Sequence, residues 1–567
     1  MLVVIVFLTL YSISNAFIPI LSRDIINALG PAGDPAFLII VIVVIFTLNV
    51  LGFIFNYFRQ KYAARAIGDV VLDLRRDATN AAFNRDLSFY DQNPTGKIVS
   101  RINTDSRDFG DGVNLTTQFL ASLLVIIFVT VYMYTINLTL SLIFTATIPI
   151  FFIVAILYRK MARRMTLTGQ RALAGVNSFV QESLSGIQIA KTFSREGKLY
   201  DQFNIINNQS YKVNLKRGFV MNFIFPTLNL VQGVVITLLI YFGGLASLAG
   251  QLSAGDLFLF IQSLWLLFFP LFQIAAFWSM LQAALAASER IFAIIDTPPV
   301  VTQIDDFKPT ELTGEIVFKD LTFQYDDDTK VLENFSLSIR PGESVAFVGH
   351  TGAGKSTIAK LLTRFYEFQK GDILIDGKSI REYDLPAYRK LIGFIPQTPF
   401  LWADTIENNI KTESAKTEEV VWALNQAGGS DWIDDLGSTG LKTNAGERGN
   451  LLSVGQRQLV ALARVLLENP AIFILDEATA SVDPFTETRI QDALEKVLQG
   501  RTSIIIAHRL WTVRKVDRII VIDHGEIVEE GNHDELMAKG GVYANLYNTY
   551  FRHQSLEYIA RSKDFKA

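Results

Sequence analysis

Long apolar runs alternate with polar segments through the first half of the chain. A helix that crosses a bilayer needs about 20 mostly apolar residues, and by that measure the pattern predicts six membrane-spanning helices. The first run has no basic lead segment and no small-residue cleavage pattern, so we interpret it as a span rather than a signal peptide. The six runs cover residues 2–21, 37–58, 119–134, 138–158, 219–248 and 257–281.

Lysine and arginine are concentrated in alternate connections between these spans. The connections after the second and fourth spans are long and basic, whereas those after the first and fifth are short and almost free of basic residues. Cytoplasmic loops carry the excess of positive charge, so the two long connections are expected to face the cytoplasm. Their helical pattern predicts helices that continue beyond the bilayer, with turns near the Pro-Thr-Gly break at 94–96 and within 185–198.

After residue 290 the pattern changes from apolar helices to short strands. A Pro-rich, acidic stretch marks a linker, and beyond it β-branched strands such as "SVAFVG" and "AIFILDE" alternate with helical segments. This alternation predicts a parallel-sheet α/β domain on the cytoplasmic side. The expected organisation is a transmembrane domain at 1–290, a linker at 291–313, the α/β domain at 314–550 and a C-terminal tail at 551–567.

Composition narrows the classes of protein that fit this pattern. Apolar residues make up 50% of the chain and charged residues 19%, in agreement with a protein that partly avoids water. The formal net charge of −4 gives no support to a nucleic-acid partner. The chain has no cysteine, which excludes disulfide frameworks and thiolate metal sites.

A phosphate-binding loop is the clearest candidate site. The sequence "GHTGAGKST" follows the strand "SVAFVG" and opens a helical run, which is the setting in which a G-x-x-x-x-G-K-[ST] match is convincing. Glycine permits the turns that aim backbone N–H groups at phosphate oxygens, and the helix adds its N-terminal dipole. Lys355 is expected to reach the β and γ phosphates, and the Ser356 hydroxyl to ligate Mg²⁺. The nucleotide-binding residues of this loop are Gly349, His350, Thr351, Gly352, Ala353, Gly354, Lys355, Ser356 and Thr357.

Polar residues at the ends of other strands complete this chemistry. Asp476 and Glu477 end the strand "AIFILDE", where Asp476 is expected to hold Mg²⁺ and Glu477 to polarise the attacking water as general base. Gln397 follows the strand "IGFIP" and can ligate Mg²⁺ or hold the water, and His508 ends "TSIIIAH" with an imidazole near the γ-phosphate. Tyr325 could stack on an adenine ring.

These motifs, together with "LLSVGQRQ" and "FILDEATASVD" in the same order, resemble the nucleotide-binding domain of ATP-binding-cassette (ABC) transporters. With the six spans ahead of it, nearly the whole chain resembles an exporter-type half-transporter. The resemblance implies that Ser453, Gly455 and Gln456 form the signature motif, which contacts ATP held by a second subunit. Asp483 then belongs to a loop that crosses the dimer interface. The chemistry of the signature motif agrees with this role, because a serine hydroxyl, a glycine backbone without a side chain and a helix N-terminus together can bind an anion.

The resemblance also implies how the two halves communicate. The tips near 91–96 and 185–189 correspond to the family's coupling helices, and "TNAGERG" at 443–449 to the segment that meets them. Val454 departs from the pattern, because the motif usually has its first glycine there. Such variation is found in one subunit of heterodimeric exporters with unequal ATP sites, so both a homodimer and a heterodimer stay open.

The expected function is ATP-driven export, by alternating access, of an amphipathic or hydrophobic cargo such as a drug-like molecule, a lipid or a peptide, with membrane lipid around the spans. Three other classes share some of these features: a soluble cassette ATPase, a nucleotide-gated channel and an importer. The last four spans carry almost no charge, which disfavours a free ion as cargo. The polar and aromatic residues of these spans either form contacts between packed helices or line a cavity for the cargo. These residues include Asn222, Asn229, Gln232, Gln262, Gln273, Phe225, Trp265, Phe269 and Trp278.

Overall fold

The computed structural model describes residues 2–28, 35–326, 329–412, 415–428, 432–433, 437–476, 484–507 and 510–551. The chain forms two compact units. The helical unit consists of Met1–Phe83 and Thr95–Thr297, and the α/β unit consists of Asn84–Pro94 and Pro298–Ala567. The boundary between Thr297 and Pro298 lies inside the segment 291–313 that was predicted to be a linker. The first residues of that segment, up to Asp296, are still part of the last helix of the helical unit.

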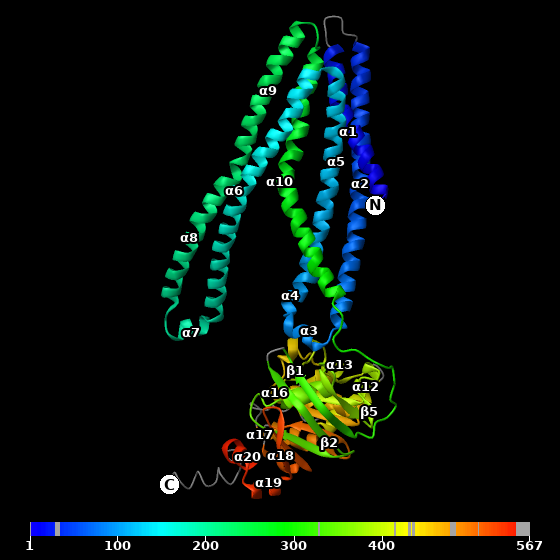
Figure 1. Cartoon of the computed structure of the whole chain (residues 1–567), viewed down its shortest axis with the longest axis vertical. Helices are drawn as coiled ribbons and strands as arrows, with labels where there is room; N and C mark the ends of the chain where they lie inside the picture. The colour runs from blue at the N-terminus through cyan, green and yellow to red at the C-terminus, as the bar shows by residue number, and fades with distance from the viewer. Residues whose placement is uncertain are drawn as a thin grey trace. The chain divides into compact units, whose positions relative to one another are not determined.

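Five of the six apolar runs each lie within one helix of the helical unit, and the fifth run, 219–248, covers the end of α8 and the whole of α9 (Figure 1). The α2 helix has 49 residues, which at about 1.5 Å per residue is more than twice the thickness of the hydrocarbon core. The predicted extension of helices beyond the bilayer is therefore confirmed. The helices are α1 (Leu2–Ala28), α2 (Pro35–Phe83), α4 (Thr95–Ser100), the π-helix η1 (Arg101–Asp105), α5 (Ser106–Ile136), α6 (Leu138–Ser185), α7 (Ile187–Thr192), α8 (Glu196–Asn222), α9 (Ile224–Leu248) and α10 (Ala254–Asp296).

Five helical stretches of the described residues are long and apolar enough to cross a membrane. The sixth run begins with a shorter apolar stretch, Ala254–Leu267, at the start of α10. The number of six spans therefore stays a prediction. The five stretches are Leu2–Ala28, Ile39–Phe83, Thr95–Ile136, Leu138–Ser185 and Glu196–Leu248.

The core of the helical unit draws side chains from α1, α5, α6, α9 and α10, among them Met133 and Phe260, which are fully buried. Figure 1 shows α6 and α8 running side by side to the short α7, and the two helices are in contact. Asp105 of η1 is buried and accepts two hydrogen bonds of 2.7 Å from the Arg290 guanidinium. This ion pair, with two hydrogen bonds, fixes the cytoplasmic part of α10 to η1 at the start of α5.

The α/β unit contains two sheets. The larger has the order β10-β9-β3-β8-β7-β6, in which all neighbours except β10 and β9 are parallel, and the smaller is the antiparallel sheet β2-β1-β4-β5. The predicted parallel sheet is confirmed, but the antiparallel sheet was not foreseen. The strands are β1 (Ile316–Gln324), β2 (Lys330–Ile339), β3 (Ser344–Val348), β4 (Lys370–Ile375), β5 (Lys378–Ser379), β6 (Ile392–Ile395), β7 (Ile472–Asp476), β8 (Thr502–Ile506), β9 (Arg518–Asp523) and β10 (Glu526–Gly531).

Two hydrophobic clusters lie on the two faces of the parallel sheet, one packed mainly against helices and the other shared with the antiparallel sheet. Strands β3, β7 and β8 are buried almost throughout, as expected for central parallel strands. The helices are α11 (Lys355–Leu362), α12 (Leu385–Lys390), α13 (Ile406–Ile410), α14 (Thr417–Gln426), α16 (Val454–Glu468), α17 (Pro484–Leu498), α18 (Leu510–Lys515), α19 (His533–Lys539) and α20 (Val542–Leu546), with shorter helical turns η2 (Gly437–Lys442), η3 (Glu447–Gly449) and η4 (Tyr547–Phe551).

The short helix α3 (Leu87–Gln92) belongs to the α/β unit although it lies between two membrane helices in the sequence. The Leu87 amide donates to the Phe365 carbonyl at 3.2 Å, and the Tyr366 hydroxyl donates to the Asp91 carboxylate. The Asp86 carboxylate accepts from the backbone amides of Val300 at 2.7 Å and Val301 at 3.1 Å. The segment that leads into the predicted turn at 94–96 is thus part of the α/β unit, which the chain leaves again after Pro94.

Candidate functional site: a phosphate-binding loop

The loop between β3 and α11 requires glycine. Gly352 and Gly354 have φ of +89° and +102°, values that residues with a side chain rarely adopt. A Cβ on Gly349 would lie 2.1 Å from the Ile522 carbonyl oxygen, which leaves no room for any larger residue. The loop is therefore built by close backbone approach at its start and by left-handed turns further on.

Lys355 is buried inside this loop, with 7% of its surface exposed. Its ammonium donates to the carbonyls of Gly349 at 2.7 Å and His350 at 2.8 Å. Burial lowers the pKa of Lys355 below its ordinary value, and nearby Asp476 opposes that shift. Gly354 begins α11 without a side-chain cap, so the first amides of the helix have no partner from a capping side chain. A buried cation beside uncapped amides fits the phosphates of a nucleotide.

Ser356 and Asp476 provide a pair of oxygen ligands next to the loop. The Ser356 hydroxyl donates to the Asp476 carboxylate at 3.4 Å, and both side chains are partly buried. β3 and β7 both pair in parallel with β8, so their carboxyl ends meet at one edge of the sheet. Hydroxyl and carboxylate oxygens fit Mg²⁺. Among the described residues no group of three or more His, Asp or Glu side chains forms a separate metal site.

Tyr325 and Gln397, the predicted adenine-stacking residue and the predicted ligand for Mg²⁺ or water, follow β1 and β6, respectively. The Tyr325 hydroxyl lies 3.1 Å from the Thr357 hydroxyl, which joins the end of β1 to the first turn of α11. Tyr325 is 42% exposed, so part of its ring is open to stacking by a base. Gln397 is exposed two residues after β6, at the same carboxyl edge of the sheet.

The signature segment forms the start of α16. Ser453 is the N-cap, and its hydroxyl accepts from the Gln456 amide at 3.2 Å. The Gln456 side chain accepts in return from the Ser453 amide at 2.8 Å. This capping box is readable from the S-x-x-Q spacing, which the sequence analysis did not use. Gly455 is buried in the first turn, and Val454 occupies the first helical position.

Three predicted site residues lie outside the described residues: Glu477, Asp483 and His508. Of the predicted cargo residues, the side chains of Gln273, Phe269 and Trp278 are also outside them. Gln232 and Gln262 each have a buried amide atom without a hydrogen bond to the described part of the chain, whereas Asn222 and Asn229 are exposed.

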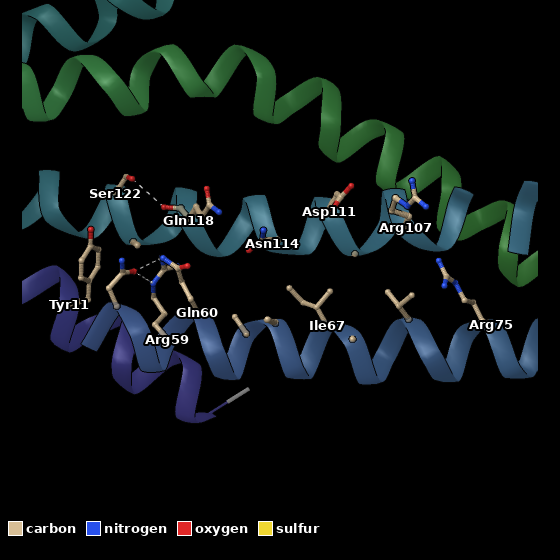
Figure 2. Close-up of a pocket in the computed structure, with 17 residues that line it drawn as sticks. Tyr11, Arg59, Gln60, Ile67, Arg75, Arg107, Asp111, Asn114, Gln118 and Ser122 are labelled. Atoms are coloured by element: carbon tan, nitrogen blue, oxygen red, sulfur yellow. Dashed lines mark hydrogen bonds between the residues drawn. The ribbon is translucent and has the colours of Figure 1, made fainter. Parts of the chain in front are cut away.

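A cavity in the helical unit is a separate feature that the sequence did not reveal. It measures about 680 Å³ and is lined by α1, α2 and α5 (Figure 2). Its signal was a polar stripe: Asn114, Gln118 and Ser122 recur every fourth residue and so share one face of α5.

The two units define a class of protein: an integral membrane protein with a cytoplasmic P-loop ATPase domain. Residues 1–271 match the family model described as ABC transporter transmembrane region, and residues 332–480 match the model described as ABC transporter. The chain belongs to the ABC transporter family and hydrolyses ATP to drive transport. The match across the helical half excludes the soluble cassette ATPases.

Relatives and a solved structure agree along most of the chain. The uncharacterized ABC transporter ATP-binding protein YknV of Bacillus subtilis is 36% identical over 522 residues, 91% of this chain and 86% of that protein. The ATP-dependent lipid A-core flippase of Syntrophus aciditrophicus is 35% identical over 490 residues, 85% and 81% of the two chains. The structure of a bacterial Atm1-family ABC exporter with ATP bound has a TM-score of 0.79 at 26% identity and covers 96% of this chain and 98% of its own. The fold is thus that of an exporter half-transporter.

Proposed function

We propose that the chain exports an amphipathic or hydrophobic cargo across the cytoplasmic membrane by alternating access, as one half of a dimer with two ATP sites. The observation that carries this proposal is the buried Lys355 at the uncapped start of α11, in a chain that also spans the membrane. The exporter-type fold supports the direction of transport.

ATP with Mg²⁺, when bound, supplies the anhydride whose cleavage drives the cycle. The loop residues from Gly349 to Thr357 bind its phosphates, with the Lys355 ammonium moving from backbone carbonyls to phosphate oxygens. Ser356, Asp476 and Gln397 would hold Mg²⁺.

The remaining roles rest on residues around this loop. Tyr325 stacks on the base through its exposed ring. Glu477 acts as general base and His508 donates toward the γ-phosphate. Ser453, Gly455, Gln456 and Asp483 contact the nucleotide held by the other subunit.

The hydrogen bonds that hold α3 in the α/β unit support a route by which ATP binding is coupled to movement of the spanning helices. Because Asp86, Leu87 and Asp91 bond to the α/β unit, a displacement of that unit pulls on the ends of α2 and α4. Closure of two α/β units around two nucleotides is then transmitted to the spanning helices as rigid-body motion. The partner is a second half-transporter, either a second copy of this chain or a different chain. Val454 in the signature motif is compatible with both a homodimer and a heterodimer.

Glu477→Gln tests the assigned chemistry. This change keeps the shape of the side chain but removes the base, so steady ATP hydrolysis is expected to stop while ATP binding persists. Hydrolysis is measured as phosphate release and binding with a fluorescent ATP analogue. Asp69→Asn, on the exposed face of α2, is a matched control that leaves both unchanged. Undiminished turnover in Glu477→Gln would refute the assignment of the general base.

A further inference from the structure

The cavity of about 680 Å³ in the helical unit has the size of a small-molecule site. Figure 2 shows Arg59 and Gln60 extending from α2 toward α5, which contributes Asn114 and Gln118. The charged side chains that line the cavity are three arginines and one aspartate, so the lining has an excess of positive charge. They are Arg59, Arg75, Arg107 and Asp111.

Arg59 is the unusual member of this group. Only 6% of its surface is exposed, yet among the described residues no carboxylate lies within 4 Å of its guanidinium. Two of its nitrogens donate to the Asn56 side-chain oxygen, at 3.2 and 2.8 Å, and the group lies 5.5 Å from the centre of the Tyr11 ring. These contacts orient the guanidinium without neutralising it. A buried arginine without a counter-ion is costly, and an anionic ligand would supply the missing charge.

The other charged residues of the cavity differ in how free they are to bind an anion. Arg75 donates to the Ser106 hydroxyl at 2.8 Å and the Asn103 carbonyl at 3.2 Å, so it mainly fixes α2 to η1 and α5. Arg107 and Asp111 are exposed at the cavity. Arg59 therefore defines the point at which an anion would be held.

The position of Arg59 along α2 indicates where the ligand comes from. It follows directly after the apolar run that ends at 58, at the cytoplasmic end of that span. Tyr57, Lys61 and Tyr62 beside it are exposed, and the Lys61 ammonium lies 5.9 Å from the centre of the Tyr57 ring. Aromatic and basic residues together mark the depth of lipid head groups. The Arg59 end of the cavity is thus expected at the level of the cytoplasmic leaflet's phosphates, and the rest of the cavity extends along α2 toward Arg75.

Small residues keep the cavity open. Ala63, Ala64 and Gly68 of α2 line it, and a Cβ on Gly68 would meet no atom within 4 Å. By contrast, a Cβ on Gly110 would lie 3.0 Å from Val71, so the helices close tightly at that point. The space is therefore built into the α2–α5 pair rather than left by loose packing.

We propose that this cavity binds the phosphate-bearing anionic head group of an amphipathic lipid from the cytoplasmic leaflet, with Arg59 as its principal ligand. A guanidinium offers paired donors that match phosphate oxygens, and the neighbouring amides of Gln60, Asn114 and Gln118 add hydrogen bonds. The lipid is the transported cargo, an assignment that rests on the export function proposed above.

The test compares binding with turnover in the purified full chain in detergent micelles. Short-chain phosphatidylglycerol, phosphatidylcholine of the same chain length and inorganic phosphate are each titrated by calorimetry, and ATP hydrolysis is followed in parallel. Arg59→Gln is expected to weaken phosphatidylglycerol binding about tenfold or more and to abolish its stimulation of hydrolysis. Arg65→Gln removes the same charge from an exposed position of α2 outside the cavity, and it is expected to bind like the wild type.

Gly68→Leu is a second variant that leaves every charge in place. It fills the open space and replaces glycine with a better helix former, so the helix is retained while binding is lost. A normal thermal unfolding temperature for both variants shows that they fold.

The possible outcomes test the site, the lipid ligand, the cargo assignment and the proposed function separately. Equal affinity in wild type, Arg59→Gln and Gly68→Leu would overturn the site, as would an equal loss in Arg65→Gln. Inorganic phosphate binding as tightly as phosphatidylglycerol would overturn the lipid assignment in favour of a free anion. Binding without stimulated hydrolysis would overturn the cargo assignment. A wild-type chain without any hydrolysis would instead refute the proposed function and leave the binding result standing.

Discussion

The attachment of α3 to the α/β unit gives a quantitative prediction at Asp86. Its carboxylate accepts from the Ser88 hydroxyl and from the amides of Val300 and Val301, at 2.7 and 3.1 Å. Asp86→Ala removes all three bonds. A hydrogen bond to a partly exposed charged acceptor contributes about 1–1.5 kcal/mol, so the two backbone bonds together contribute about 2–3 kcal/mol. Local opening of this joint should then become about 30- to 150-fold more frequent.

Hydrogen–deuterium exchange at the Val300 and Val301 amides measures this opening directly, because these amides are the donors. Their exchange should accelerate by that factor in Asp86→Ala and by less in Asp86→Asn, which keeps one acceptor oxygen. Asp69→Ala on α2, an exposed aspartate of the helical unit, should leave the exchange unchanged. Identical exchange in wild type and Asp86→Ala would refute the idea that the carboxylate holds α3 in place.

The same contact predicts a dependence on pH. Burial alone would raise the pKa of Asp86, but hydrogen bonds from Ser88 and the backbone amides outweigh it and lower the pKa below its ordinary value. The contribution is therefore complete above the pKa of the unfolded chain and is lost as the pH falls through the lowered pKa of the folded state. Exchange at Val301, corrected for its intrinsic pH dependence, should show this loss in wild type and not in Asp86→Ala.

Three further changes test other parts of the structure. Gly349→Ala places a Cβ 2.1 Å from the Ile522 carbonyl and should abolish nucleotide binding, measured with a fluorescent ATP analogue; tight binding would contradict the geometry of the loop. Arg290→Met leaves the buried Asp105 carboxylate without its partner and should cost about 2–4 kcal/mol, seen as a lower thermal unfolding temperature, whereas an unchanged temperature would show that the pair contributes nothing. Ser453→Ala removes the N-cap of α16 and should cost only about 1 kcal/mol in chemical unfolding, while ATP hydrolysis falls at least tenfold; parallel losses would assign the serine a structural role alone.

Much of the architecture could be predicted from the sequence because its signals are long or local. Runs of about 20 apolar residues identify spanning helices without knowledge of their neighbours. The strand, glycine loop and helix around Lys355 form one continuous segment whose conformation depends on its own residues. The order of the parallel strands then brings Asp476 to the same edge as Ser356, a contact that the motifs already implied.

What could not be predicted depends on contacts between distant segments. The segment with α3 was placed within the transmembrane domain, with a tip near 91–96 that meets the α/β domain, but its bonds to Phe365 and Tyr366, and that of Asp86 to Val300, make it part of the α/β unit itself. The antiparallel sheet arises from the pairing of β1 with both β2 and β4, and alternation of strands and helices says nothing about that pairing. The cavity around Arg59 requires two helices to lie side by side, so no single segment reveals it.

In the proposed function, the chain uses ATP hydrolysis to move an amphipathic cargo against its gradient. Inside-out membrane vesicles that contain the chain, with the required partner subunit, measure this most directly by uptake of a labelled amphipath. We expect ATP to drive accumulation of the amphipath above its equilibrium level. Lys355→Ala removes the buried cation of the phosphate loop and should abolish this accumulation. Uptake that reaches only equilibrium while ATP is hydrolysed would contradict a pump and favour a nucleotide-gated channel.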